Sequence, residues 1–340
     1  MSTSAPEQQT IDPAVLFSDP EKLHAHVRDR DSLIPEALRL ASDSLDDIET
    51  LRIAVNNRYK QAIGDQKKED KDAPDRTLNL SEDAPLVQML KKTLDDLKVS
   101  NNDATKELCR QIKGTVFGPW LEAYPGLGAK SLARLLGPLG DPYLRTVIDY
   151  AEDDTERKKP LGKHYEPRTL RQLWSYAGLA TDEQGQAKRR TKGMSQAESF
   201  SLGNPVLRKR AYVISETLQK NGVNKNDELI AEEKALEEAK ERARAEKKPL
   251  PKTPSGPYDL ERRYPSTSHG KVYLDRRAQT AERRHGAPCV RCGPSGSPAQ
   301  PGSLWSNGHQ HADALRMVSK QILKELWLLA REHHTGIPAE

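Results

Sequence analysis

Two apolar seams in the first third of the chain constrain its fold most strongly. Between residues 38 and 59, and again between residues 87 and 108, apolar residues recur at spacings of three and four. This spacing places them along one side of a helix. The polar, turn-rich segment between the seams therefore predicts an antiparallel helical hairpin over residues 33–112, or a dimeric coiled coil. The seam residues are Leu38, Ala41, Leu45, Ile48, Val55 and Tyr59, then Val87, Leu90, Leu94, Leu97, Ala104 and Leu108.

A glycine-rich turn follows the seams in the stretch YPGLGAKSLARLLGPLG, residues 124–140. Apolar residues at helical spacing lie on both sides of the turn, which predicts a helix-hairpin-helix unit. Glycines there adopt positive φ angles and let a nucleic-acid backbone approach the amides that begin the second helix, where the helix dipole favours an anion. The alternative is a turn that only joins two packed helices. The candidate phosphate-binding residues are Gly126, Leu127, Gly128, Lys130, Ser131 and Arg134.

Charge is unevenly distributed along the chain. Residues 1–110 carry 16 basic and 22 acidic side chains, whereas residues 111–220 carry 18 and 12. The middle third is therefore the part expected to face an anion. Its basic clusters predict a track for DNA, or for a structured RNA, and a solvated surface run is the alternative for each. The candidate residues of this track are Lys188, Arg189, Arg190, Lys192, Asn204 and Arg208.

Four motifs follow one another in this part: PGLGAKSLARLLGPLGDP, LRQLWSYAGL, GQAKRRTKG and GNPVLRKRAYVIS. In this order and spacing they resemble the C-terminal domain of the DEDD-type insertion-sequence transposases, the family that includes the Piv-type DNA invertases. The resemblance covers about residues 120–218 and implies DNA transposition or site-specific recombination. The helical hairpin before it is similar to the coiled-coil segment that these transposases carry ahead of this domain.

The sequence leaves catalysis open. Members of this family begin with a nuclease-like α/β domain whose acidic tetrad binds divalent metal, but residues 1–110 show helical seams and no alternating strands. At the position of the family's nucleophilic serine, Gln184 precedes Gly185. We name no catalytic residue and expect a relative that binds DNA without cutting it. The alternatives are an active, Mg²⁺-dependent transposase that uses a rearranged serine and a non-catalytic helical scaffold. The serines in this interval are Ser195, Ser199 and Ser201.

The C-terminal part contains a candidate metal site. Cys289 and Cys292 form a C-x2-C pair, and His309 and His311 follow after 16 residues. Zinc binds thiolate and imidazole in this mixture, so we expect a Zn²⁺ site made of these four residues, with His285 as a spare candidate. The alternative is a loop pair of cysteines and two histidines that cap the last helix.

The composition predicts several small helical units, because 35% of the residues are hydrophobic and 31% are charged. The expected class is all-α: a helical hairpin or coiled coil, then a small helix-hairpin-helix domain and a helical tail. Residues 1–32 are expected to be disordered or loosely helical, and residues 33–112 to form the hairpin. Residues 113–220 are expected to form the transposase-like domain, residues 221–257 a charged helix and linker, and residues 258–340 the segment with the zinc site and terminal helix.

The chain lacks both an apolar run of about 18 residues and the basic and apolar regions of a secretion signal. These features predict a cytoplasmic protein of a prokaryotic cell or a phage, with no membrane partner. The coiled-coil seams predict a homo-oligomer.

Overall fold

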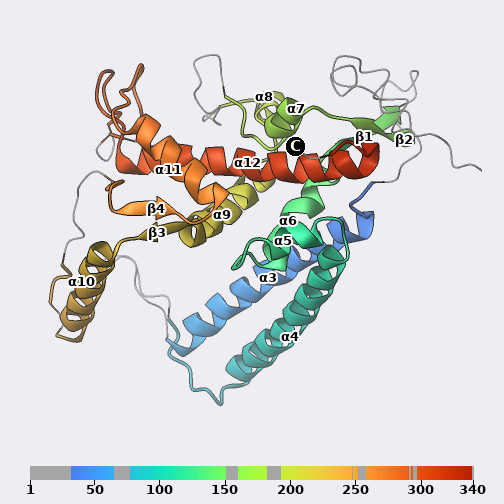
Figure 1. Cartoon of the computed structure of the whole chain (residues 1–340). Helices are drawn as coiled ribbons and strands as arrows, with labels where there is room; N and C mark the ends of the chain where they lie inside the picture. The colour runs from blue at the N-terminus through green and yellow to red at the C-terminus, as the bar shows by residue number, and fades with distance from the viewer. Residues whose placement is uncertain are drawn as a thin grey trace, which may run out of the picture. The chain divides into compact units, whose positions relative to one another are not determined.

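The computed structural model describes residues 32–64, 77–150, 160–181, 193–246, 248–251, 258–290, 292–293 and 297–338. They are mostly helical, with two small antiparallel sheets, which confirms the expected all-α class (Figure 1). The chain divides into two compact units: unit 1 is Met1–Leu121, Gly128–Arg168 and Leu329–Glu340, and unit 2 is Glu122–Leu127 and Thr169–Leu328. The segment 113–220, expected as one domain, is thus shared between both units. All but the last residue of the segment 1–32 lies outside the described residues.

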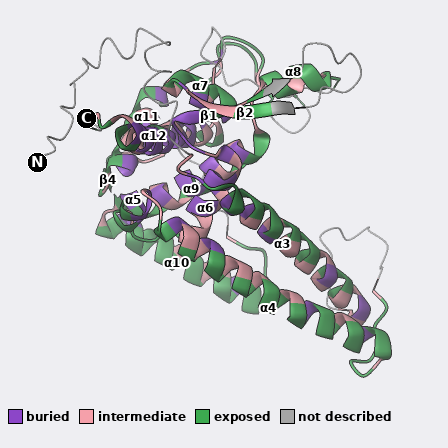
Figure 2. Ribbon diagram, turned by 90° about the vertical axis from the view of Figure 1, so that its right-hand side faces the viewer, coloured by how far each residue is buried: buried purple, intermediate pink, exposed green. Residues whose placement is uncertain are grey.

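The two apolar seams form the two long helices of unit 1. Helix α3 spans Glu36–Ile63 and α4 spans Pro85–Lys113, and the two pack together as an antiparallel hairpin (Figure 1). Proline suits the first position of α4, because an N–H at that position would have no partner within the helix. Much of the surface of both helices is exposed or half-buried (Figure 2). The buried seam residues are Leu38, Leu45 and Val55 on α3, and Val87, Leu94 and Leu108 on α4.

The short helix α5 (Gly118–Glu122) and helix α6 (Ala129–Leu139) follow, and α6 packs on both α3 and α4. Three leucines of α6 are fully buried and supply its apolar contact: Leu132, Leu135 and Leu136. Gly137 lets α6 approach α3 closely, since a Cβ at this position would meet the side chain of Ser42. The helix that follows the glycine turn is therefore anchored on the long hairpin.

Unit 1 also contains a β-hairpin that sequence analysis did not predict. Strands β1 (Leu144–Tyr150) and β2 (Pro160–Pro167) pair in antiparallel register. Arg145 lies opposite Glu166, and its Nε donates a hydrogen bond of 3.0 Å to the carboxylate. The second strand reads PLGKHYEP and lacks the apolar alternation by which strands are recognised. Pairing with β1, rather than a local pattern, therefore defines this strand.

A buried carboxylate connects separate segments of unit 1. Oδ1 of Asp141 accepts hydrogen bonds from the backbone N–H groups of Tyr143 (2.8 Å) and Leu144 (3.0 Å). Its Oδ2 accepts one from the N–H of Leu33 (2.9 Å) and lies 2.7 Å from Nε2 of His334. Asp141 and His334 are both buried. The carboxylate thus links the α6–β1 connection to the residues before α3 and to the last turn of helix α12 (Asn307–Thr335).

Unit 2 is built mainly from helices. Its elements are α7 (Leu170–Tyr176), α8 (Gln196–Ser201), α9 (Pro205–Gly222), β3 (Val223–Lys225), α10 (Asp227–Ala245), β4 (Arg263–Pro265), α11 (Ser268–Thr280) and the part of α12 (Asn307–Thr335) up to Leu328. Strands β3 and β4 pair antiparallel, and α11 packs on α9. The buried hydroxyls of Ser215 on α9 and Ser319 on α12 lie 2.7 Å apart. These contacts bring α9, α11 and α12 into one core.

We expect Gly270→Ala to destabilise unit 2 by about 1–3 kcal/mol, the usual cost of overpacking. The end of α9 meets the start of α11 at two glycines, and a Cβ at Gly270 would overlap the carbonyl of Gly222. Backbone atoms can avoid this overlap only if a whole helix shifts. Urea unfolding of the full chain measures the effect, with Gly308→Ala as control because no described atom lies within 4 Å of a Cβ there. Equal stability of the two variants would contradict this packing.

Candidate functional site

The glycine turn between α5 and α6 has the backbone geometry expected of a helical hairpin. Gly126 has a φ of +87°, which side chains disfavour, and the N–H of Leu127 donates to the carbonyl of Tyr124 at 3.1 Å. Leu127 is buried, whereas Gly128 is exposed and precedes the first residue of α6. No described side chain caps the amides of this helix start. No described atom lies within 4 Å of a Cβ built at Gly128, so a side chain at this exposed position would meet no neighbour.

Asn221, at the end of α9, makes a hydrogen bond to the backbone of the glycine turn. Its Nδ2 donates a hydrogen bond of 3.2 Å to the carbonyl of Pro125. A Cβ at Gly126 would collide with the same amide group. A glycine is therefore required at position 126 by both its φ angle and the nearby side chain of Asn221. The backbone conformation at position 128 is one that other residues can adopt. Sequence reasoning did not identify Asn221, because it lies 96 residues from Pro125 in the chain.

Lys130 and Arg134, expected to face phosphate, point to acidic residues of α3. Lys130 pairs with Glu49, and Arg134 pairs with Asp46 and, at 2.8 Å, with Glu49. Burial by itself would raise the pKa of Glu49, but the hydrogen bonds and charges of these two cations outweigh it and hold the pKa below its ordinary value. A phosphate at the turn would compete with these carboxylates for both cations.

The other candidate DNA-binding residues differ in their burial and contacts. Ser131 is half-buried in the first turn of α6, and its N–H donates to the carbonyl of Gly128 at 2.9 Å. Asn204 caps α9, because its Oδ1 accepts hydrogen bonds from the two amides at positions 206 and 207. Arg208 is half-buried one turn further along α9. The cluster Lys188, Arg189, Arg190 and Lys192 lies outside the described residues, as do Gln184 and Gly185.

The serines considered as nucleophiles lie on or beside the short helix α8. Ser195 is its N-cap: the hydroxyl accepts a hydrogen bond from the N–H of Glu198 (3.2 Å) and donates one to the carboxylate of Glu198 (2.8 Å). Ser201 donates to the carbonyl of Glu198 at 2.7 Å. These are the ordinary contacts of helix-capping hydroxyls. They give no residue a catalytic role.

A ribbon of two irregular strands in unit 2 carries the candidate metal ligands. Residues 283–289 run antiparallel to residues 299–305, with bridges from Arg284 to Leu304 and from Cys289 to Ala299. The N–H of Cys292 turns back to the carbonyl of Cys289 at 3.4 Å, which brings the two thiols to one side of the turn. The ribbon then leads directly into α12. Two cysteines on a turn thus come to lie beside the start of a helix.

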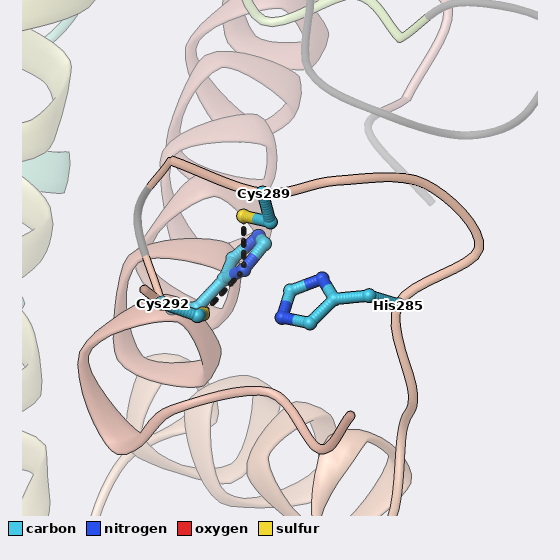
Figure 3. A group of neighbouring side chains, drawn as sticks. His285, Cys289 and Cys292 are labelled. Atoms are coloured by element: carbon cyan, nitrogen blue, oxygen red, sulfur yellow. Dashed lines mark hydrogen bonds between the residues drawn. The ribbon is translucent and has the colours of Figure 1, made fainter. Parts of the chain in front are cut away.

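Four side chains meet at this position. The ligand atoms of His285, Cys289, Cys292 and His309 all lie within 4.8 Å of one another, so the cluster could hold a metal ion. Nδ1 of His309 lies 3.6 Å from the sulfur of Cys289 and 3.3 Å from that of Cys292. In Figure 3 both labelled cysteines and the ring of His285 are gathered around the same small space. Three members of the expected set are brought together, and His285 completes it.

His311 is the expected ligand that the structure places elsewhere. Its Nδ1 lies 2.8 Å from the hydroxyl of Tyr273 on α11, and the two rings meet edge to face. The reason is the helix itself: α12 begins at Asn307, and side chains two positions apart on an α-helix point in nearly opposite directions. When His309 faces the cysteines, His311 faces α11. The H-x-H spacing within a predicted helix is the sequence signal that only one of the two histidines can face the cysteines.

The groups around the cluster hold its members in place. Trp305 stacks on His309 with the ring centroids 4.0 Å apart and the planes at 2°. Ser306 precedes α12, and its N–H and hydroxyl both contact the sulfur of Cys292, at 3.3 and 3.1 Å. Burial lowers the pKa of His285, which favours the neutral imidazole that can bind a metal. The cluster is therefore held in place by the side chains around it.

Among the described residues, no helix is long and apolar enough to cross a membrane. Comparisons of the chain with family models, curated proteins and solved structures give no match.

Proposed function

We propose that this chain is a transposase-related DNA-binding protein that acts in DNA transposition or site-specific recombination. The proposal rests on the ordered motifs of residues 120–218 and on one structural observation: α6 starts beside Gly128, which is exposed, and no described side chain caps this helix start. Backbone amides at a helix start bind phosphate well. Because phosphates are common to all sequences, this contact would position the protein without selecting a base sequence.

The ion pairs that α6 makes with α3 limit which groups can contact a phosphate first. Lys130 and Arg134 can reach a phosphate at the turn only in exchange for Glu49 and Asp46. The amides, which carry no such partners, would make the first contact. The alternative nucleic acid is a structured RNA. The alternative functions are a non-catalytic helical scaffold and an active transposase with rearranged catalytic residues.

A second copy of the chain is the proposed protein partner, through the α3–α4 hairpin. Both helices carry exposed large apolar side chains, which an interface between copies would cover. These are Leu40, Leu51 and Ile53 on α3, and Leu86, Met89 and Val99 on α4.

The test is Gly128→Val in the full chain, measured by fluorescence anisotropy with duplex DNA of unrelated sequences. We expect the parent to bind all duplexes similarly, with an affinity that falls steeply as salt rises, because counterions are released. The valine should weaken binding at least about tenfold, roughly 1.4 kcal/mol, by blocking the approach to the amides. Gly126→Val is unsuitable, since its φ angle and Asn221 would strain the fold.

Gly114→Val is the matched control, at an exposed glycine that ends α4. It should bind DNA as the parent does. Absence of binding at low salt, or equal binding by the Gly128 and Gly114 variants, would contradict the proposed interface.

We propose further that the metal of the C-terminal cluster is Zn²⁺. Two thiolates with two imidazoles are a ligand set that zinc accepts, while Mg²⁺ and Ca²⁺ prefer oxygen ligands. The clustering of His285, Cys289, Cys292 and His309 supports this assignment.

A further inference from the structure

We infer that the zinc centre proposed above is a closed structural site whose fourth ligand is His285, and that Ser306 positions Cys292 within it. The inference goes beyond DNA binding and rests on the proposed zinc. It assigns His311 to the packing of α11 against α12. The spacing of the ligand atoms, a buried nitrogen with no partner among the described residues, and the contacts of Ser306 support it.

The distances between ligand atoms fit a tetrahedral zinc ion. With Zn–S of about 2.3 Å and Zn–N of about 2.0–2.1 Å, tetrahedral angles separate a ligating sulfur from a ligating nitrogen by about 3.5 Å. The two measured separations, from Nδ1 of His309 to the sulfurs of Cys289 and Cys292, are 3.6 and 3.3 Å. Both sulfurs therefore already stand at the distance from Nδ1 of His309 that zinc requires.

His285 supplies the fourth position. Its side chain is buried, and its Nε2 has no hydrogen-bond partner among the described residues. A buried nitrogen without a partner costs free energy, which a metal bond to it would offset. The largest separation within the set of four ligand atoms is 4.8 Å or less, so a closure of about 1 Å completes the tetrahedron. The backbone of His285 is held on the ribbon, where its N–H donates to the carbonyl of Ser303 at 2.9 Å.

Ser306 acts on the site through Cys292. Its backbone N–H donates to the sulfur at 3.3 Å, and its hydroxyl lies 3.1 Å from the same atom. The hydroxyl also accepts a hydrogen bond from the N–H of His309 at 3.2 Å. One residue therefore orients a thiol ligand and fixes the helix turn that carries an imidazole ligand. Groups that orient ligands in this way influence metal affinity substantially.

Four protein ligands leave no position for a water or a substrate. Catalytic zinc sites keep such a position open, whereas closed four-ligand sites are structural. The expected role of this site is therefore to fasten the ribbon of residues 283–289 and 299–305 to the start of α12.

The experiment is Co²⁺ binding to the full chain, followed by competition with Zn²⁺. The parent should give the visible absorption of tetrahedral Co²⁺ and sulfur-to-cobalt charge transfer, with one metal ion per chain. His285→Ala should lower affinity by more than the roughly 10- to 100-fold that loss of an orienting neighbour costs. His311→Ala, its matched control, should retain the parent's affinity and spectrum. His285→Cys should bind with stronger charge transfer, because a third sulfur joins the metal.

Ser306→Ala should lower zinc affinity about 10- to 100-fold, with a changed cobalt spectrum, and Ser306→Thr should restore both. A parent that binds no metal would overturn the zinc assignment itself. A parent that binds zinc while His285→Cys keeps the parent's spectrum, or while His311→Ala loses affinity, would leave zinc in place and overturn His285 as ligand. Equal affinity of Ser306→Ala and the parent would overturn the positioning role.

Discussion

Asp141→Asn is expected to destabilise the chain by about 3–5 kcal/mol, because a buried carboxylate loses several of its charge-assisted hydrogen bonds. The carboxylate accepts three backbone hydrogen bonds and contacts His334, and its side chain is buried. An asparagine has a single acceptor oxygen, so its NH₂ group would face either backbone N–H donors or the imidazole. Urea unfolding at neutral pH measures the loss. Asp103→Asn, at an exposed position of α4, is the control and should change stability by no more than about 0.5 kcal/mol.

The loss of stability in Asp141→Asn is expected to depend on pH. Burial alone would raise the pKa of Asp141, but the hydrogen bond and charge of His334, with the amides of Leu33 and Leu144, outweigh burial and lower it. A carboxyl whose pKa is lower in the folded state stabilises the fold above its unfolded pKa of about 3.9. This contribution is lost as pH falls through the folded value. The difference between parent and Asp141→Asn should therefore shrink below about pH 4, and a difference that grows in acid would contradict this account.

Removal of the proposed zinc ion is expected to lower the melting temperature of unit 2 by roughly 10 °C. A ligand present at 1,000 times its dissociation constant stabilises the fold by about 4 kcal/mol, and each kcal/mol shifts the melting temperature by about 2–4 °C for a unit of this size. Without the proposed zinc, the thiols and imidazoles of the cluster would no longer hold the ribbon to α12. Differential scanning calorimetry with and without a zinc chelator measures the shift.

The matched variants for this experiment are both cysteine substitutions. Cys289→Ser combined with Cys292→Ser should lose the bound zinc, melt at the chelated temperature and show no response to chelator. Cys109→Ser, on α4 in unit 1, should keep the metal and the full response. A melting temperature that chelator leaves unchanged in the zinc-loaded parent would contradict a structural role for the metal.

The sequence by itself determined the features that depend on local periodicity and turn chemistry. The spacing of Leu38, Leu45 and Val55 predicted the buried side of α3, because each helical turn sets which residues share a face. The two glycines at 126 and 128 likewise predicted the turn before α6. The C-x2-C pair predicted the candidate metal cluster, since two cysteines three positions apart can approach one ion.

Only the tertiary structure decided which distant groups meet. Nothing near Lys130 in the sequence indicates that Glu49, 81 residues away, faces it. The pairing of β2 with β1 also depends on cross-strand contacts, since the residues of β2 show no strand pattern of their own. The choice of His285 over His311 required the direction of α12, because the helix turns two neighbouring histidines to opposite sides while the ribbon brings a more distant one to the cysteines. The spacing of residues thus determines which side of each helix is apolar. The packing of these helices determines which distant residues form a site.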